Sequence, residues 1–281
     1  MKKIGEEKII ETVKELFLDA VKLLPEDVYC AFEESLKVEE SPLGKAVLEQ
    51  LIENKKIAES EGMALCQDTG FAVVFIEWGN KVIFEGEDLF KAVNEGVRKA
   101  YNEGYYRKSI VNDPLFDRKN TGDNTPCLLH FEFVPGENVR IVAAPKGGGS
   151  ENMSAIRMLR PADGIEGVKK FVLETVEKAG GNPCPPIIVG IGIGGTFEKA
   201  AYLSKKALLR EIGKHNGDKR YAKLEEELLS EINKLGIGPM GFGGRVTALA
   251  VNIEYYPCHI ASLPVAVNIQ CHSARHKEVI L

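Results

Sequence analysis

A run of unlike polar side chains is the first feature of this sequence that suggests chemistry. Cys66-Gln67-Asp68-Thr69-Gly70 places a thiol, an amide, a carboxylate and a hydroxyl in succession, just ahead of an apolar run. These groups cannot all point into an apolar core without leaving polar atoms unsatisfied. The segment is therefore either a turn closed by Asp68 and Thr69 or part of a site.

Two other polar segments leave similar alternatives. Residues 120–126 suit a plain connection as well as a site. In 145–153 a strand pattern leads into a short helix, and Gly147, Gly148 and Gly149 would let backbone N–H groups converge on an anion beside Lys146. The Gly-Lys-Ser/Thr ending of a P-loop is absent. Residues 145–153 therefore form either an anion site or a flexible turn.

Cys184 lies in the proline-rich run Asn182–Pro186, where prolines fix the backbone around the thiol. A ligand suits this position better than a core residue. The glycines of 190–195 match a dinucleotide-binding fingerprint by letter. However, they lie inside the strand pattern, and the helix after them leads to no strand that carries a ribose-binding acid. We discount the nucleotide reading.

Paired cysteine and histidine residues near the C-terminus raise a zinc alternative. Cys258-His259 and Cys271-His272 have the side chains for tetrahedral ligation. Structural zinc sites usually separate their ligands by two or more residues, whereas these ligands are adjacent. A zinc-binding protein is therefore a competing reading that needs a test.

Hydrophobic periodicity predicts the elements that must position these residues. Apolar residues recur at helical spacing from Ile9 to Leu24, where Pro25 ends the pattern. Strands 128–134 and 139–144 are expected to form a hairpin around the turn 135–138. Further helices are predicted at about 43–60, 89–104, 164–179, 197–213 and 218–234, and further strands at 71–78, 246–256 and 263–270. This order predicts an α+β fold with helices packed on mixed, largely antiparallel β-sheets. We expect one compact domain over 1–281 that could have two lobes.

Composition narrows the class of protein. The 281 residues are 44% hydrophobic and 27% charged, as in soluble globular proteins, and the net charge of −5 argues against a nucleic-acid partner. The uncharged stretches 179–197 and 255–274 contain prolines that a membrane span tolerates poorly, so no membrane association is expected. No secretory signal precedes Glu6, which predicts a cytoplasmic protein. Six cysteines in a reducing compartment argue against a disulfide framework.

Together, the motifs resemble the class I, iron–sulfur-dependent fumarate hydratase and tartrate dehydratase family, specifically its α-subunit or N-terminal half. The resemblance covers nearly the whole chain, and the order of the motifs makes it specific. It is carried by Cys66–Gly70, Lys146–Ser150, Pro183–Pro186, Gly194–Thr196 and Cys271.

The resemblance implies that Cys66, Cys184 and Cys271 ligate three irons of a [4Fe-4S] cluster. The fourth iron, without a protein ligand, would act as a Lewis acid. The implied reaction is the reversible dehydration of a 2-hydroxydicarboxylate, (S)-malate to fumarate in the first place. L-tartrate dehydratase and mesaconate hydratase α-subunits are the alternatives within the family.

The same resemblance implies roles for individual residues. Asp68 would carry out acid–base chemistry, and Gln67 would donate a hydrogen bond to substrate. Arg107 would pair bidentately with a substrate carboxylate, Gly148 would offer a backbone donor, and His259 would lie in the pocket. The remaining cysteines have no assigned role and are expected in the core or in loops: Cys30, Cys127 and Cys258.

The chain also departs from the single-chain members of this family. Those members continue into a second domain with a catalytic threonine, whereas this sequence stops ten residues after Cys271. We therefore expect a separate β-subunit to complete the active site, in an assembly of two α and two β chains with α–α contacts. A non-catalytic scaffold subunit is the remaining alternative class.

Overall fold

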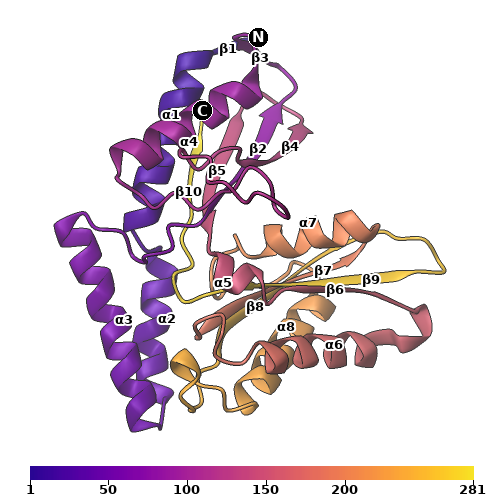
Figure 1. Ribbon diagram of the computed structural model, residues 1–281. Coiled ribbons are helices and arrows are strands. Elements are labelled where there is room, and N and C mark those ends of the chain that lie inside the picture. Colours follow the sequence, from indigo (N-terminus) through magenta and orange to yellow (C-terminus); the bar gives the residue numbers. More distant parts are fainter. The chain divides into compact units, whose positions relative to one another are not determined.

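The computed structural model describes residues Met1–Leu281, and the chain divides into two compact units. The first unit contains Met1–Pro25, Lys55–Gly148 and Arg275–Leu281, and the second contains Glu26–Asn54 and Gly149–Ala274. Each unit has its own four-stranded sheet (Figure 1). The expectation of a single domain over 1–281 stays a prediction.

The sheet of the first unit has the strand order β10-β5-β2-β4. Strand β4 runs parallel to β2, whereas β5 is antiparallel to both β2 and β10. Two short strands form a separate parallel pair, β1 with β3. The strands of this unit are β1 (Lys2–Gly5), β2 (Phe71–Gly79), β3 (Val82–Glu85), β4 (Leu128–Val134), β5 (Val139–Lys146) and β10 (Lys277–Ile280).

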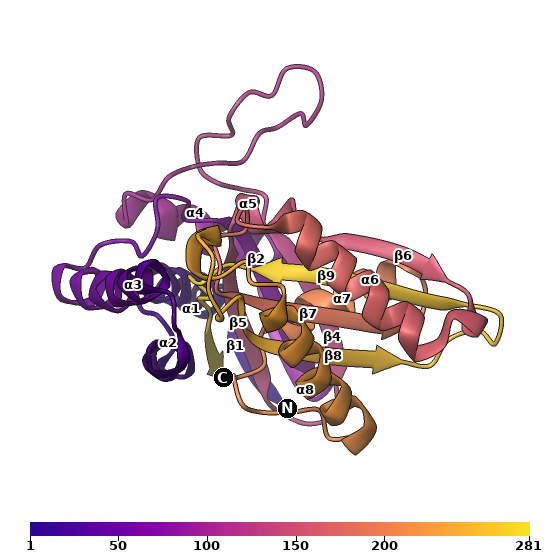
Figure 2. The ribbon, with the colours of Figure 1, turned by 90° about the horizontal axis from the view of Figure 1, so that it is seen from below.

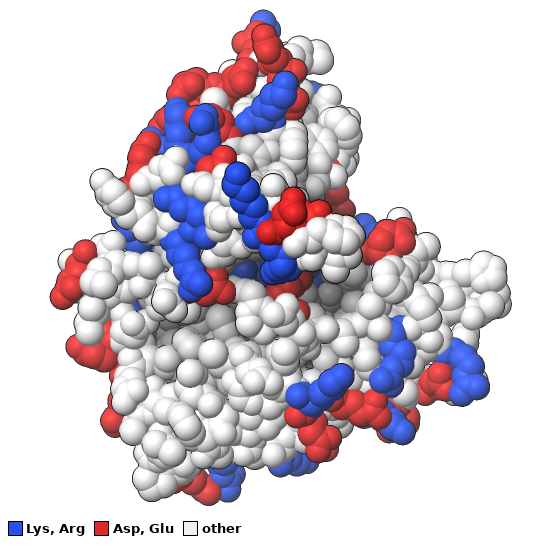
Figure 3. All heavy atoms as spheres, viewed as in Figure 1, with Lys and Arg blue, Asp and Glu red and all other residues white.

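Helices α1 (Glu6–Lys22) and α4 (Leu89–Glu103) cover one face of this sheet. Their buried side chains share a core with Val74, Ile76 and Trp78 of β2. The two helices approach closely at Gly96, where a Cβ atom would lie 2.7 Å from the carbonyl oxygen of Ile10. Acidic and basic side chains alternate over α1 and α4 on the face shown in Figure 3. Ion pairs link the two helices there, between Lys14 and Glu103 and between Lys99 and both Glu7 and Glu11.

The predicted hairpin of 128–134 with 139–144 is wrong. Strands β4 and β5 follow each other in sequence, but β2 lies between them and pairs with both. The reason is that β2 is buried along nearly all its length. A strand buried in this way satisfies its backbone groups best between two neighbours. The local turn pattern at 135–138 carried no information about that insertion.

The sheet of the second unit has the order β6-β9-β7-β8, with β8 parallel to β7 and the other neighbours antiparallel. Helices α6 and α8 lie on one face of the sheet and α7 on the other (Figures 1 and 2). The strands are β6 (Ala155–Leu159), β7 (Ile187–Gly194), β8 (Ala248–Tyr256) and β9 (Leu263–Gln270). The helices are α2 (Glu26–Val38), α5 (Gly148–Glu151), α6 (Gly164–Ala179), α7 (Phe197–Ala207) and α8 (Lys219–Lys234), and α3 (Pro42–Glu61) begins in this unit.

Strand alternation explains the glycines of β7. Its odd-numbered residues, such as Val189 and Ile191, belong to the core with α6 and α8. Its even-numbered glycines face α7: a Cβ on Gly190 would lie 2.1 Å from the carbonyl oxygen of Ser204, and one on Gly192 would lie 2.0 Å from that of Ala200. Helix packing therefore requires these glycines, in agreement with our rejection of the nucleotide reading.

The α+β fold class with mixed sheets is confirmed. The predicted helix at 197–213 ends earlier, at Ala207, and α2 was not predicted at all. None of the helices is both long and apolar enough to span a membrane.

Candidate functional site

Asp68 is the centre of a fixed turn in the first unit. Its Oδ1 accepts the N–H of Gly70 at 2.9 Å, and its Oδ2 accepts the N–H of Gly148 at 2.8 Å. Gly70 has a φ of +88°, and a Cβ there would lie 2.8 Å from the backbone nitrogen of Lys146. The turn that contains Asp68 thus requires glycine where it meets the end of β5.

The backbone carbonyls of this turn are also held. The hydroxyl of Tyr101 lies 2.8 Å from the carbonyl oxygen of Thr69 and 3.0 Å from that of Gly70, and Asn124 donates its amide N–H to Gly70 as well. Burial raises the pKa of Tyr101, so this hydroxyl keeps its proton and acts as a donor. Arg275 donates Nη2–H to the carbonyl oxygen of Asp68.

Arg275 carries donors that nothing in the structure accepts. Its side chain is 2% exposed, and its Nε and Nη1 have no hydrogen-bond partner. A buried guanidinium without a counter-charge is costly, because charged groups are strongly hydrated in water. The orphaned donors therefore indicate an anionic ligand near the Asp68 turn. No motif marked Arg275 in the sequence, because its signal is burial rather than spacing.

The other predicted residues of this unit are connected to the same turn through the backbone. Cys66 is half-buried and Gln67 is exposed. Arg107 lies in the long segment between α4 and β4, and its side chain is exposed. The hydroxyl of Thr69 donates to the carbonyl oxygen of Arg107 at 2.9 Å, which ties that backbone to the turn. The unit therefore brings Asp68 and Gly148 into contact and ties the segment of Arg107 to them.

Two predicted cysteines of the second unit are linked through one carbonyl group. The carbonyl oxygen of Cys184 accepts the N–H of His272 at 3.3 Å and lies 2.9 Å from Nδ1 of the same residue. His272 directly follows Cys271, which comes immediately after the last residue of β9. The contact thus fixes the segments of Cys184 and Cys271 to each other.

Cys184 has an unusual backbone. Its φ is +56°, a left-handed conformation that is rare for any residue other than glycine. Its N–H donates to the carbonyl oxygen of Gly181 at 3.0 Å, which closes a tight turn ahead of Pro185. Strain of this kind often accompanies a functional constraint. The expected effect of the neighbouring prolines on the Cys184 thiol stays a prediction.

His259 lies away from these cysteines within the same unit. It is exposed in the loop between β8 and β9, where its ring accepts the N–H of Ala261 at 3.1 Å. The eight residues of β9 separate its loop from Cys271, a length of roughly 26 Å at about 3.3 Å per residue. Closeness in sequence therefore does not bring His259 beside Cys271, and its place in a substrate pocket stays a prediction.

The remaining cysteines occupy ordinary positions. Cys127 belongs to the core of the first unit, and burial raises the pKa of its thiol to about 12. Cys30 is exposed on α2, and the exposed Cys258 contacts the carbonyl oxygen of Ser262 in its own loop. Nothing in these surroundings activates a thiol.

The donor set fits an iron–sulfur cluster by its chemistry. Cys66, Cys184 and Cys271 form no disulfide and are of intermediate exposure, and thiolates are the usual ligands of such clusters. The structure holds no group of three or more His, Cys, Asp or Glu side chains that could hold a metal ion. Ligation of a cluster by these three cysteines therefore stays a prediction, and so does the zinc alternative.

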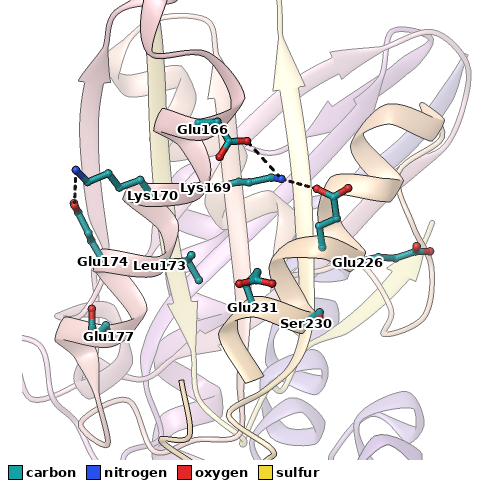
Figure 4. Close-up of a pocket in the computed structure, with 10 residues that line it drawn as sticks. Glu166, Lys169, Lys170, Leu173, Glu174, Glu177, Glu226, Ser230 and Glu231 are labelled. Atoms are coloured by element: carbon teal, nitrogen blue, oxygen red, sulfur yellow. Dashed lines mark ion pairs between the residues drawn. The ribbon is translucent and has the colours of Figure 1, made fainter. Parts of the chain in front are cut away.

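A groove on the surface of the second unit has no such chemistry. It lies between α6 and α8, with a volume of about 940 Å³ (Figure 4). Lys169 forms ion pairs there with Glu227 at 2.6 Å and Glu166 at 3.8 Å. The first pair links α6 to α8 and the second lies within α6, and such surface pairs contribute little to stability or binding. The groove is a solvated helix surface.

Comparison with known proteins identifies the family. A family model described as fumarate hydratase (fumerase) matches residues 10–280. A protein of Methanocaldococcus jannaschii named "Putative L(+)-tartrate dehydratase subunit alpha" is 50% identical over 272 residues, which cover 95% of each chain. The L(+)-tartrate dehydratase subunit alpha of Escherichia coli O157:H7 is 33% identical over 262 residues, 92% of this chain and 86% of that protein. The chain therefore belongs to the fumarate hydratase family of hydro-lyases.

Proposed function

We propose that this chain is the α-subunit of a hydro-lyase that dehydrates a 2-hydroxydicarboxylate, with L(+)-tartrate as the first candidate substrate. The names of the similar α-subunits support tartrate over the (S)-malate that we expected first. The reaction would remove a proton from one carbon and hydroxide from its neighbour, and the enol so formed becomes oxaloacetate. (S)-malate, which would yield fumarate, is the second candidate, because the family model carries the name fumarate hydratase.

The two contacts of His272 with the carbonyl oxygen of Cys184 are the observation that supports the proposal most directly. They hold two of the three candidate cluster ligands in one arrangement, although 87 residues separate them in sequence. Cys66, Cys184 and Cys271 would hold a [4Fe-4S] cluster. When bound, that cluster would supply an iron without a protein ligand as a Lewis acid toward the substrate hydroxyl.

Asp68 would take the proton from carbon. Each of its oxygens already accepts one backbone N–H, but a carboxylate oxygen has a second lone pair, so both can still accept a proton. The fixed turn would keep this carboxylate in one orientation, which a general base requires. Gly148 has a single backbone N–H, and it donates to Asp68, so Gly148 would orient the base. The expected hydrogen bond from Gly148 to substrate would have to replace that contact.

Charged and polar side chains of the first unit would bind the substrate. The exposed guanidinium of Arg107 can pair with a carboxylate through two parallel hydrogen bonds, and the exposed amide of Gln67 can donate one more. A separate β-subunit would complete the pocket, since the relatives are named as α-subunits. We further propose an α2β2 assembly in the cytoplasm.

Steady-state kinetics of the anaerobically reconstituted chain with its β-subunit test the function. L(+)-tartrate, (S)-malate and mesaconate are compared by kcat/KM, with oxaloacetate, fumarate and the hydrated product measured directly. The proposal expects the highest kcat/KM for L(+)-tartrate and loss of turnover in Asp68→Asn. Higher kcat/KM for (S)-malate would move the assignment to the second candidate. Absence of turnover with all three, in a preparation that contains the cluster, would contradict the proposed reaction.

A further inference from the structure

A buried carboxylate in the second unit has no part in the chemistry described so far. Glu39 follows α2 and is 1% exposed. Its Oε1 accepts the N–H groups of Glu40 and Ser41 at 2.9 Å. Its Oε2 accepts those of Arg245 and Val246, also at 2.9 Å. Four backbone donors around one buried carboxylate fix its position and hold the segment of Arg245 against the end of α2.

The segment held by Glu39 is the end of a glycine-rich loop, residues 236–246. The loop closes on itself through the N–H of Gly243, which donates to the carbonyl oxygen of Ile237 at 2.8 Å. Gly244 has a φ of +141°, and a Cβ there would lie 2.7 Å from Oε1 of Glu39. Only glycine lets the loop come this close to the carboxylate.

The middle of the same loop contacts the turn that contains Cys184. The N–H of Met240 donates to the carbonyl oxygen of Pro185 at 2.8 Å. Gly241 packs against Gly181, since a Cβ on Gly241 would lie 2.6 Å from the Cα of Gly181. The loop thus touches the turn on both sides of Cys184, at the residue that accepts its N–H and at the residue that follows it.

Cys184 needs such support because its backbone conformation is unfavourable. A left-handed conformation is unfavourable for a residue with a side chain, and it persists only where the surroundings impose it. The contacts that impose it here are the carbonyl of Gly181, the link to His272 and the glycine-rich loop. The loop is in turn held by Glu39.

We propose that Glu39 is a positioning residue for Cys184, acting through the glycine-rich loop 236–246 that contacts Gly181 and Pro185. The consequence for a cluster rests on the proposed function, in which Cys184 is a ligand. The backbone conformation of Cys184 itself does not depend on iron. The positioning role of Glu39 and the role of Cys184 as a cluster ligand can therefore fail independently of each other.

The test compares thiol reactivity in the full chain before reconstitution with iron. Each cysteine is alkylated with iodoacetamide under anaerobic conditions, and the rates are followed by peptide mass spectrometry in wild type, Glu39→Gln and Gly241→Ala. Glu225→Gln is the matched control, because Glu225 is also 1% exposed and accepts backbone N–H groups, those of Ile253 and Asn216. Cys66 serves as the internal reference.

We expect the rate at Cys184, relative to Cys66, to rise about tenfold in Glu39→Gln, because loss of a buried acceptor releases the loop. Gly241→Ala should raise the alkylation rate at Cys184 in the same selective way, because the added methyl group would collide with Gly181. This variant keeps the proposal testable if Glu39→Gln does not fold. Amide hydrogen exchange at Cys184 should accelerate in parallel. Equal rates in wild type and both variants, or an equal rise in Glu225→Gln, would overturn the proposal.

Iron and sulfide content after reconstitution separates this proposal from the proposed function. A selective rise at Cys184 together with fewer bound irons supports both. A selective rise with full cluster content supports the positioning role of Glu39 and contradicts only the idea that cluster binding requires this backbone conformation of Cys184.

Discussion

Asp68 and Gly148, 80 residues apart in sequence, are joined by a hydrogen bond of 2.8 Å from the backbone N–H of the glycine to Oδ2 of the carboxylate. This contact resolves an ambiguity of the sequence. The glycine-rich segment was either an anion site or a flexible turn, and in the structure the anion that it meets is the side chain of Asp68. The polar turn and Gly148 of the glycine-rich segment are therefore joined within the first unit.

Asp68→Asn tests the catalytic side of this contact. The amide oxygen can still accept one of the two backbone N–H groups, so the turn should persist, but an amide cannot take up a proton. We expect kcat to fall about 10²–10⁴-fold, the usual contribution of a general base, with the cluster content unchanged. Asp113→Asn is the control, because Asp113 closes an exposed turn by accepting the N–H of Leu115. Equal kcat for wild type and Asp68→Asn would remove Asp68 from the acid–base role.

Arg275→Met tests whether the orphaned guanidinium donors serve an anionic ligand. Removal of an uncompensated buried charge should leave the free energy of unfolding of the iron-free chain unchanged or raise it by about 1 kcal/mol. The iron retained after reconstitution should fall, because an anionic cluster would lose its counter-charge. Chemical denaturation and iron assay measure the two quantities, with Arg157→Met, which removes an exposed ion pair to Glu174, as the control. Marked destabilisation of the iron-free chain with normal iron content would show a purely structural role.

The pH dependence of the free energy of unfolding should reflect the ionisation of the Glu39 carboxyl. Burial raises the pKa of Glu39, but the N–H groups of Ser41, Val246, Arg245 and Glu40 together bring the pKa below its ordinary value. The folded pKa is thus lower than the unfolded one, so this carboxylate stabilises the fold above its unfolded pKa of about 4.3 and loses that effect as pH falls through the folded pKa.

In Glu39→Gln the free energy of unfolding should fall by about 1–3 kcal/mol at neutral pH, and the difference from wild type should shrink in acid. Denaturant unfolding at a series of pH values measures this. A difference between wild type and Glu39→Gln that stays constant into acid would contradict the account.

Gly192→Ala tests the packing of α7 on β7. The new methyl group would lie 2.0 Å from the carbonyl oxygen of Ala200, so the helix must shift or the strand must bend. We expect the free energy of unfolding to fall by about 1–3 kcal/mol, the usual cost of overpacking. Gly217→Ala should change little, because a Cβ there meets no atom within 4 Å. Thermal unfolding measures both, and similar melting temperatures for the two variants would show that the glycines of β7 have another purpose.

Local pattern predicted most of the elements but not how they pair. The long periodic helices α4, α6 and α8 begin and end within one residue of the expected positions, because an amphipathic face and its end signals are local properties. The insertion of β2 between β4 and β5 is a long-range pairing, which local turn signals cannot reveal. Short strands such as β1 and β10 were missed, since four residues give almost no periodicity.

In the candidate site too, local sequence patterns indicate some residues, whereas others depend on long-range contacts. Cys66, Asp68 and Cys184 could be chosen from the sequence because polar or cysteine residues stand where helix and strand patterns do not explain them. Arg275 and Glu39 could not, because their importance comes from burial and from partners far away in the sequence. His259 shows the limit of sequence spacing: it lies twelve residues before Cys271, but the whole length of β9 separates the two, and its role stays a prediction.

Iron and acid-labile sulfide per chain, measured after anaerobic purification and reconstitution, test the central claim most directly. Cys66→Ala, Cys184→Ala and Cys271→Ala are measured beside wild type, with Cys30→Ala as the control because Cys30 is exposed on α2 and has no assigned role. The account predicts about four irons and four sulfides in wild type and Cys30→Ala, and loss of the cluster in each of the other three variants. Wild-type protein without iron, or with metal that survives substitution of Cys66 and Cys184, would contradict it.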